Sequence, residues 1–154
     1  MYRSKKKRLR LYNKNGFKVN LPQNFGELHV KELSYSTSER HIDEVRFFED
    51  HQNEVNIPNI GKTPVSGITF RDGFKWEIQL VQATATVELK TKYCGTIVMD
   101  KPQLFFYGNG QVSHGSLRNK IHCSGIPGRP DFFGIPTFDP EGIPYHWTLE
   151  DAKL

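Results

Sequence analysis

Residues 105–149 read FFYGNGQVSHGSLRNKIHCSGIPGRPDFFGIPTFDPEGIPYHWTL and contain the clearest pattern in the chain. In this stretch an aromatic residue leads to a glycine-centred turn, and a short alternating run then ends on a leucine. The two copies of the pattern are marked by Phe106, Gly110 and Leu117 and by Phe138, Gly142 and Leu149. The first copy contains Asn-Gly, which favours tight hairpin turns because both residues tolerate positive φ angles. The pattern therefore predicts β-hairpins.

Alternation of apolar and polar residues predicts further antiparallel strands outside this stretch. The clearest run is Phe74–Leu80, where large apolar side chains alternate with polar ones. Such a run suits a sheet with one buried face and one wet face, so we expect Lys75, Glu77 and Gln79 to face solvent. Two runs rich in β-branched residues, Thr84–Leu89 and Thr96–Met99, lie on either side of Gly95 and are also predicted strands.

Residues 7–21 predict one more hairpin. Leucines alternate with arginines before Asn13–Gly16, and apolar residues alternate with polar ones after it. Turn-forming residues between two alternating runs are typical of a hairpin. This arrangement would place Arg8, Arg10 and Lys18 on the solvent face. After Pro22, we expect Leu28 and Val30 to begin the next strand.

Residues 38–50, SERHIDEVRFFED, carry two incompatible patterns. A helix would be capped by Ser38 and would carry Ile42, Val45 and Phe48 along one side. A strand would instead alternate through Val45 and Phe47. We favour the strand, because the neighbouring sequence is strand-like on both sides.

Glycine and proline interrupt the chain often, with 13 and 9 residues, and no long helical periodicity is present. At 154 residues the chain fits a single domain. We therefore expect one all-β domain, an antiparallel meander of short hairpins arranged as an open repeat sheet, a sandwich or a barrel. Proline cannot donate to a strand ladder, so the proline-rich last thirty residues are expected to close the sheet at an edge. Tyr145, Trp147 and Leu149 alternate and are predicted to form the closing strand.

The segment Phe106-Tyr107-Gly108-Asn109-Gly110, followed by Leu117 and Gly125-Ile126-Pro127, resembles a family of bacterial hairpin repeats. These repeats are similar to variant MORN-type repeats, in which F/Y-Y-x-N-G heads each unit. The match covers residues 104–127, with a degenerate copy at Phe138–Leu149 and weaker echoes at Leu11–Leu21 and Phe70–Leu80. The resemblance implies a scaffold or interaction element and no catalytic residues.

Positive charge is concentrated at the N-terminus, where six of the first ten residues are basic and none is acidic. The rest of the chain is close to neutral. The arm at residues 1–10, with the following strand, supplies the candidate binding residues Lys5, Lys6, Lys7, Arg8, Arg10 and Lys18. Such a segment can bind nucleic acid by releasing counterions, or an anionic membrane surface, or it can serve only as a solvated terminus.

Enzymatic candidates are few. A small hydrolase or ligand-binding barrel would draw on His114, Ser116, Cys123 and His146, but no G-x-S-x-G pattern surrounds either Ser113 or Ser116. His122 and Cys123 are neighbours on a predicted strand, so their side chains should point to opposite faces. None of the six histidines forms an H-x-H or H-E-x-x-H pattern, and we expect neither a metal nor a cofactor.

The cellular compartment is predicted from absences. There are two cysteines, Cys94 and Cys123, and no apolar run approaches the length of a transmembrane segment or follows the basic start as in a signal peptide. These features predict a cytoplasmic protein with reduced thiols.

Together the patterns predict a non-enzymatic β-repeat protein with a binding or structural role. A protein partner, or a second copy of the chain, would pair with an uncapped sheet edge. One alternative is a nucleic-acid-binding protein that uses the basic N-terminal hairpin. The other is the hydrolase or ligand-binding barrel that uses His114 or His146.

Overall fold

The computed structural model describes residues 8–21, 25–37, 40–48, 53–71, 76–117 and 119–145. The described residues form fourteen β-strands and no helix, which confirms the predicted all-β fold. The main sheet contains β1 (Arg8–Leu21), β2 (Gly26–Ser36), β3 (His41–Phe47), β4 (Asn53–Ile57), β5 (Gly61–Phe70), β6 (Ile78–Ala83), β9 (Gln103–Phe106) and β10 (Val112–Gly115). Three separate hairpins pair β7 (Val87–Lys90) with β8 (Thr96–Met99), β11 (Ile121–Cys123) with β12 (Phe132–Gly134), and β13 (Thr137–Phe138) with β14 (Pro144–Tyr145).

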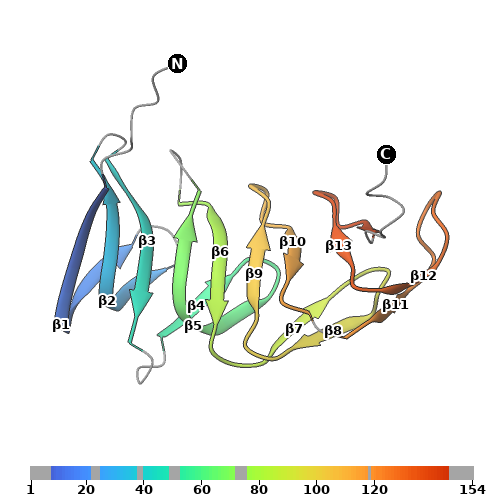
Figure 1. Ribbon diagram of the computed structural model, residues 1–154, viewed down its shortest axis with the longest axis horizontal. Coiled ribbons are helices and arrows are strands. Elements are labelled where there is room, and N and C mark those ends of the chain that lie inside the picture. Colours follow the sequence, from blue (N-terminus) through green and yellow to red (C-terminus); the bar gives the residue numbers. More distant parts are fainter. Residues whose placement is uncertain are drawn as a thin grey trace, which may run out of the picture.

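The main sheet is an open antiparallel meander. Its strands follow the order β1-β2-β3-β5-β6-β9-β10, and Figure 1 shows this order from one end of the molecule towards the other. The long strand β5 pairs on the same side with β3 and β4, at Gly67–Thr69 and Gly61–Val65 respectively. Of the arrangements that the sequence allowed, the structure shows the open sheet.

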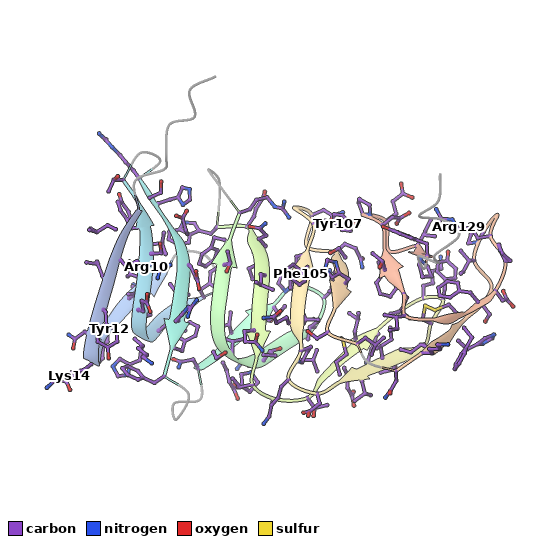
Figure 2. The ribbon with its side chains drawn as sticks, viewed as in Figure 1. Arg10, Tyr12, Lys14, Phe105, Tyr107 and Arg129 are labelled. Atoms are coloured by element: carbon purple, nitrogen blue, oxygen red, sulfur yellow. A yellow bond between two sulfur atoms is a disulfide. The ribbon has the colours of Figure 1, made fainter. Side chains whose placement is uncertain are left out.

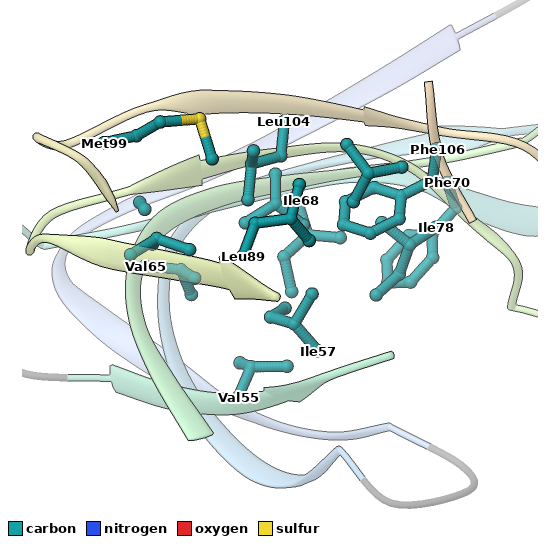
Figure 3. Close-up of a cluster of buried hydrophobic side chains, with 14 of the residues drawn as sticks. Val55, Ile57, Val65, Ile68, Phe70, Ile78, Leu89, Met99, Leu104 and Phe106 are labelled. Carbon is teal, nitrogen blue, oxygen red and sulfur yellow. The ribbon is translucent and has the colours of Figure 1, made fainter. Parts of the chain in front are cut away.

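A row of apolar residues crosses the sheet on its buried face. Leu33 lies opposite Val45, which lies opposite Ile68, and the row continues through Val81 to Leu104. All five are buried. Figure 3 shows Ile68 and Leu104 packed with side chains of β4, among them Val55 and Ile57. Because alternate residues of a strand point to opposite faces, the neighbouring row faces outwards through Glu44, Thr69, Leu80, Phe105 and His114.

The predicted hairpin at residues 7–21 is wrong. The whole segment from Arg8 to Leu21 is one strand, β1, and both of its halves pair with β2. The turn-forming residues 13–16 make a bulge between the two halves, in which Asn13 Oδ1 accepts a hydrogen bond from Asn15 N at 2.9 Å. A type I′ hairpin turn needs two successive positive φ angles, and in this bulge only Gly16 has one, at 75°. The residues therefore loop out of the strand without reversing it.

Replacing Gly16 by alanine is expected to destabilise this bulge. A Cβ atom at Gly16 would overlap the His29 ring and would lie 2.6 Å from Phe48 Cε2. Gly95 provides the matched control, because its φ is also positive, at 66°, but nothing lies within 4 Å of a Cβ placed there. Both substitutions cost the strain of a positive φ, so overpacking should make Gly16→Ala about 1–2 kcal/mol more destabilising than Gly95→Ala in urea unfolding. Equal losses would contradict the packing of the bulge.

The strand predicted at Phe74–Leu80 is displaced towards the C-terminus. Strand β6 begins at Ile78 and ends at Ala83. Trp76 lies in a turn with a φ of 57°, and the Glu77 carbonyl accepts a hydrogen bond from Arg71 N at 2.8 Å. Of the polar residues expected on the solvent face, Gln79 is exposed, Glu77 is half-buried in the turn, and Lys75 lies outside the described residues together with Phe74. The alternation thus runs through a turn and only its end belongs to a strand.

Other expected elements agree with the structure. Residues 41–47 form strand β3, so the strand was the correct choice for the ambiguous segment, whose first and last residues lie outside the described ranges. The predicted strand Thr96–Met99 is β8, and Leu28 and Val30 lie in β2. Strands β9 and β10 flank the Asn-Gly turn. Of the closing strand, Tyr145 belongs to β14, while Trp147 and Leu149 lie outside the described residues.

The turns of two hairpins share one geometry and lie side by side. In the first, Gly110 N donates to Tyr107 O and Tyr107 N to Gln111 O; in the second, Gly142 N donates to Asp139 O and Asp139 N to Ile143 O. Side chains tie neighbouring turns together, since Asn109 Nδ2 donates to Pro140 O at 2.8 Å and Asn59 Nδ2 to Gly110 O at 3.1 Å. The turns after β4, β9 and β13 therefore form a contiguous row.

The expectation of reduced thiols is wrong, because Cys94 and Cys123 form a disulfide. Cys94 lies in the turn between β7 and β8, and Cys123 ends β11. The bond therefore joins the hairpin that comes after β6 in the chain to the hairpin that comes after β10. The two cysteines are 29 residues apart in sequence, and only the meander brings them together. Within the described residues, no helix is long and apolar enough to cross a bilayer.

Candidate functional site

The described catalytic candidates each have structural contacts of their own. His114 is exposed on β10 with its ring stacked on Phe105 at 4.3 Å, and the Ser116 hydroxyl accepts a hydrogen bond from Gln103 N at 3.1 Å. Cys123 is buried in the disulfide and therefore carries no thiol, and His146 lies outside the described residues. The contacts of the described candidates are thus structural, and they differ from one candidate to the next.

Ser113 and His114 form a serine–histidine contact that resembles part of a hydrolase site. Ser113 Oγ lies 2.9 Å from His114 Nδ1 and 3.3 Å from the Phe105 carbonyl oxygen. Neither residue lines any of the pockets described below. Asp131, the next acidic residue along the chain, accepts a hydrogen bond from Gly125 N at 3.2 Å within its own loop. The contact therefore lies outside both pockets, and this carboxylate bonds elsewhere.

The remaining described histidines have different surroundings. The His29 ring lies against Phe48 with centroids 5.6 Å apart, His41 Nδ1 lies 3.3 Å from Asp43 Oδ1, and His122 is exposed. Across the ranges that the structure describes, no group of three histidine, cysteine or acidic side chains is placed to hold a metal ion.

Basic side chains gather at the β1 end of the sheet. Figure 2 shows Arg10, Tyr12 and Lys14 there, far from Arg129 at the opposite end. Arg10 and Lys18 are exposed, and Arg10 Nη1 lies 3.9 Å from Glu32 Oε1. For Arg8 the structure describes the backbone alone, and Lys5, Lys6 and Lys7 lie outside the described residues.

The outer edge of β1 is an open sheet edge. Among the described strands, β1 pairs with β2 alone. Three of its large side chains are exposed, with Leu9 at 50%, Leu11 at 46% and Tyr12 at 63%. Leu11 lies directly opposite Leu33, so it occupies the next position of the buried apolar row. At the other end of the sheet, β10 contacts β13.

The outward face of the sheet near β1 is balanced in charge. Arg46 Nε donates to Glu44 Oε1 at 2.7 Å, and this hydrogen bond raises the pKa of the Arg46 guanidinium above its ordinary value. Together with the Arg10–Glu32 pair, it leaves the face around a 380 Å³ hollow near neutral.

A second hollow, of about 470 Å³, lies beside the row of turns. One wall is an aromatic cluster in which the Phe70 ring meets both Phe25, at 5.7 Å, and Trp76, at 5.2 Å, edge to face. The Gly108–Gly110 turn also lines the hollow. We call this hollow the turn pocket; it is lined by Phe25, Asn56, Pro58, Trp76, Glu77, Ile78, Phe106, Tyr107, Gly108, Asn109 and Gly110.

Two polar groups of the turn pocket have defined surroundings. Glu77 Oε2 lies 4.0 Å from Arg71 Nε, beyond hydrogen-bond range, while Arg71 Nη2 donates to the Phe106 carbonyl at 2.6 Å. The Tyr107 hydroxyl donates to the Phe138 carbonyl at 2.7 Å. Burial raises the pKa of Tyr107 above its ordinary value, so this hydroxyl stays protonated.

Sequence reasoning did not identify the turn pocket. It placed Trp76 and Glu77 on opposite faces of one strand, whereas the turn directs both to the same hollow. No local pattern links them to Phe25 or to Asn56, which join the pocket through the curvature of the sheet.

Comparisons of this chain with protein-family models, with curated proteins and with solved structures find no match.

Proposed function

We propose that this chain is a non-enzymatic binding protein that accepts an extended, acidic segment of a protein partner along the open edge of β1. The observation that carries the proposal is the exposed end of the buried apolar row at Leu11. An open edge presents unpaired backbone N–H and C=O groups, which a partner strand can satisfy. A strand added there would place an apolar residue beside Leu11 and so extend the row by one position.

The charge of β1 favours an acidic partner over a second copy of the chain. The strand contains four basic residues, Arg8, Arg10, Lys14 and Lys18, and no acidic residue. Like charges facing each other across a strand pair are destabilising, whereas opposite charges stabilise it. Pairing β1 with another β1 would bring the basic residues of both copies together. A segment in which acidic and apolar residues alternate would match both the charge and the apolar period of β1.

This proposal predicts that Leu11→Asn weakens binding of a labelled peptide in which Glu and Val alternate. Burying a leucine contributes about 1.5–3 kcal/mol, so the dissociation constant should rise about tenfold or more in fluorescence anisotropy titrations at low salt. Val98→Asn is the matched control, because Val98 is equally apolar and 58% exposed but lies on β8, away from the edge. We expect Val98→Asn to bind like the unaltered protein.

Four results would contradict this assignment. The first is failure of the Glu/Val peptide to bind at low salt, and the second is equal binding of a peptide in which Lys and Val alternate. The third is that the protein sediments as a dimer and Leu11→Asn sediments as a monomer, because a second copy of the chain would then occupy the β1 edge. The fourth is binding of a labelled oligonucleotide with no binding of either peptide, since it would favour the nucleic-acid alternative at Lys5, Lys6 and Lys7.

The compartment follows from the disulfide. Disulfides persist in oxidising compartments and are rare in the cytoplasm, where thiols are kept reduced. The Cys94–Cys123 bond therefore favours an oxidising compartment for the protein over the predicted cytoplasm. An edge strand that binds an extended segment is compatible with either location.

The likeness to MORN-type repeats is part of the same proposal. It is supported by the shared hydrogen-bond pattern of the turns at Tyr107–Gln111 and Asp139–Ile143. The asparagine of the F/Y-Y-x-N-G pattern, Asn109, donates to the neighbouring turn and so has a role between units. Repeating units that stack in one direction leave an end at which a further strand can be added.

A further inference from the structure

We propose that the turn pocket binds a neutral carbohydrate of a few sugar rings, at a site independent of the β1 edge. Its volume, about 470 Å³, falls within the range of about 300–1,000 Å³ that is usual for small-molecule sites. Four segments from distant parts of the chain line it, around residues 25, 56–58, 76–78 and 106–110. Small-molecule sites are typically lined by hydrophobic and aromatic side chains together with a few polar groups.

The aromatic wall supplies an apolar surface of the right kind. Phe70 is buried and holds Phe25 and Trp76 edge to face, so the two outer rings are fixed in place while remaining half-exposed beside the pocket. A sugar ring has an apolar face of C–H groups that packs on an aromatic side chain, and its hydroxyls remain at the rim. Fixed aromatic rings bind with little loss of conformational freedom.

The backbone at Trp76 gives a second, independent observation. Its φ of 57° is unusual for a bulky residue, which strongly prefers negative values. Strained backbone of this kind is concentrated at ligand sites, where the surrounding structure maintains it. Here the residue with the positive φ, Trp76, and its neighbour Glu77 both line the pocket.

The polar groups favour hydroxyls over a charged ligand. The Glu77 carboxylate faces the Arg71 guanidinium, so the pair is close to neutral. The 4.0 Å between Glu77 Oε2 and Arg71 Nε is too long for a hydrogen bond, and the Nε atom is buried while Glu77 lines the pocket. A carboxylate only accepts hydrogen bonds, whereas a hydroxyl can donate to it. A sugar hydroxyl can therefore donate to the Glu77 carboxylate, and an anion cannot.

Gly108 keeps this arrangement open. A Cβ atom at Gly108 would lie 3.2 Å from Glu77 Oε2 and 4.0 Å from Arg71 Nε. The absence of a side chain thus allows Glu77 to lie over the turn at the pocket wall. Asn56 is exposed at the rim, where its amide can donate to and accept from further hydroxyls.

The test uses the fluorescence of Trp76 in a Trp147→Phe background, since Trp147 is the other tryptophan of the chain. The probes are cellotriose, maltotriose and triacetylchitotriose, titrated at millimolar concentrations. We expect at least one of them to change the Trp76 emission saturably. Glu77→Gln should raise the dissociation constant of that sugar about tenfold, because it removes the charged acceptor. Glu88→Gln, at an exposed position of β7, is the matched control and should leave the constant unchanged.

Three outcomes would overturn the proposal. One is that none of the three sugars changes the Trp76 emission of the unaltered protein or of Gly108→Ala, while circular dichroism shows that both are folded. Another is sugar binding that Glu77→Gln leaves unchanged. The third is a saturable response to tetramethylammonium without a response to sugars, which would make the pocket a cation site. Peptide binding at β1 is measured separately with Leu11→Asn, so failure here leaves the proposed function unaffected.

Discussion

Ile68→Ala is expected to lower the free energy of unfolding by about 2–5 kcal/mol. Ile68 is 1% exposed and stands in the middle of the apolar row, between Val45 on one side and Val81 on the other. Truncating it removes buried methyl groups and leaves a cavity that two paired strands prevent from closing. Urea unfolding followed by circular dichroism measures this change as a lower midpoint urea concentration, with the dependence of the unfolding free energy on urea unchanged.

The control for Ile68→Ala is Ile135→Ala, the same substitution at a position that is 46% exposed, between β12 and β13. Surface substitutions are usually within about 0.5 kcal/mol of neutral. A loss at Ile135 as large as that at Ile68 would contradict the buried row. So would an Ile68→Ala variant that unfolds at the same urea concentration as the unaltered protein.

The strands were predictable where alternation coincided with pairing. Thr96–Met99 is β8 because its β-branched residues fit a pleated strand and Gly95, at a φ of 66°, supplies the turn before it. The hairpin at Asn109-Gly110 was predictable for the same local reason. These elements depend on contacts close in sequence, which a local pattern can report.

Prediction failed where a local pattern had two possible uses. Asn13–Gly16 is a good turn sequence, but the strand β2 is long enough to pair with residues on both sides of it, and the turn became a bulge. Similarly, the alternation at Phe74–Leu80 did not reveal that Trp76 lies in a turn. The choice in each case depends on distant partners, which the local pattern does not contain.

The candidate sites depended on distant contacts even more strongly. The basic character of β1 was visible in sequence, because charge needs no fold. That Leu11 continues the buried row became evident only from the register of β1 with β2. Phe25 and Gly108 both line the turn pocket, and no sequence pattern in either segment predicts that the two segments lie close together.

The cysteines show the same limit, and they lead to the other large expected effect. Removing the disulfide with Cys94→Ala and Cys123→Ala should lower the free energy of unfolding by about 3.5 kcal/mol. The bond closes a loop across 29 residues of sequence, and cross-linking a loop of that length removes much conformational entropy from the unfolded chain. Alanine is the appropriate replacement because both sulfur-bearing residues are buried, and a serine hydroxyl there would need a hydrogen-bond partner.

Reduction separates the contribution of the disulfide to the free energy of unfolding from the contribution of the packing of the two side chains. A reductant should bring the unaltered protein close to the stability of the double alanine variant and leave the variant itself unchanged in urea unfolding. Before reduction, thiol titration of the unfolded chain should find no free thiol, because both cysteines of the chain are in the bond. Two titratable thiols, or a stability that reductant does not alter, would contradict the bond. Reduction should lower local stability most in the two hairpins that the disulfide joins. Amide exchange in β7–β8 and β11–β12 should therefore accelerate more than exchange in β2 or β3, which the cross-link does not join.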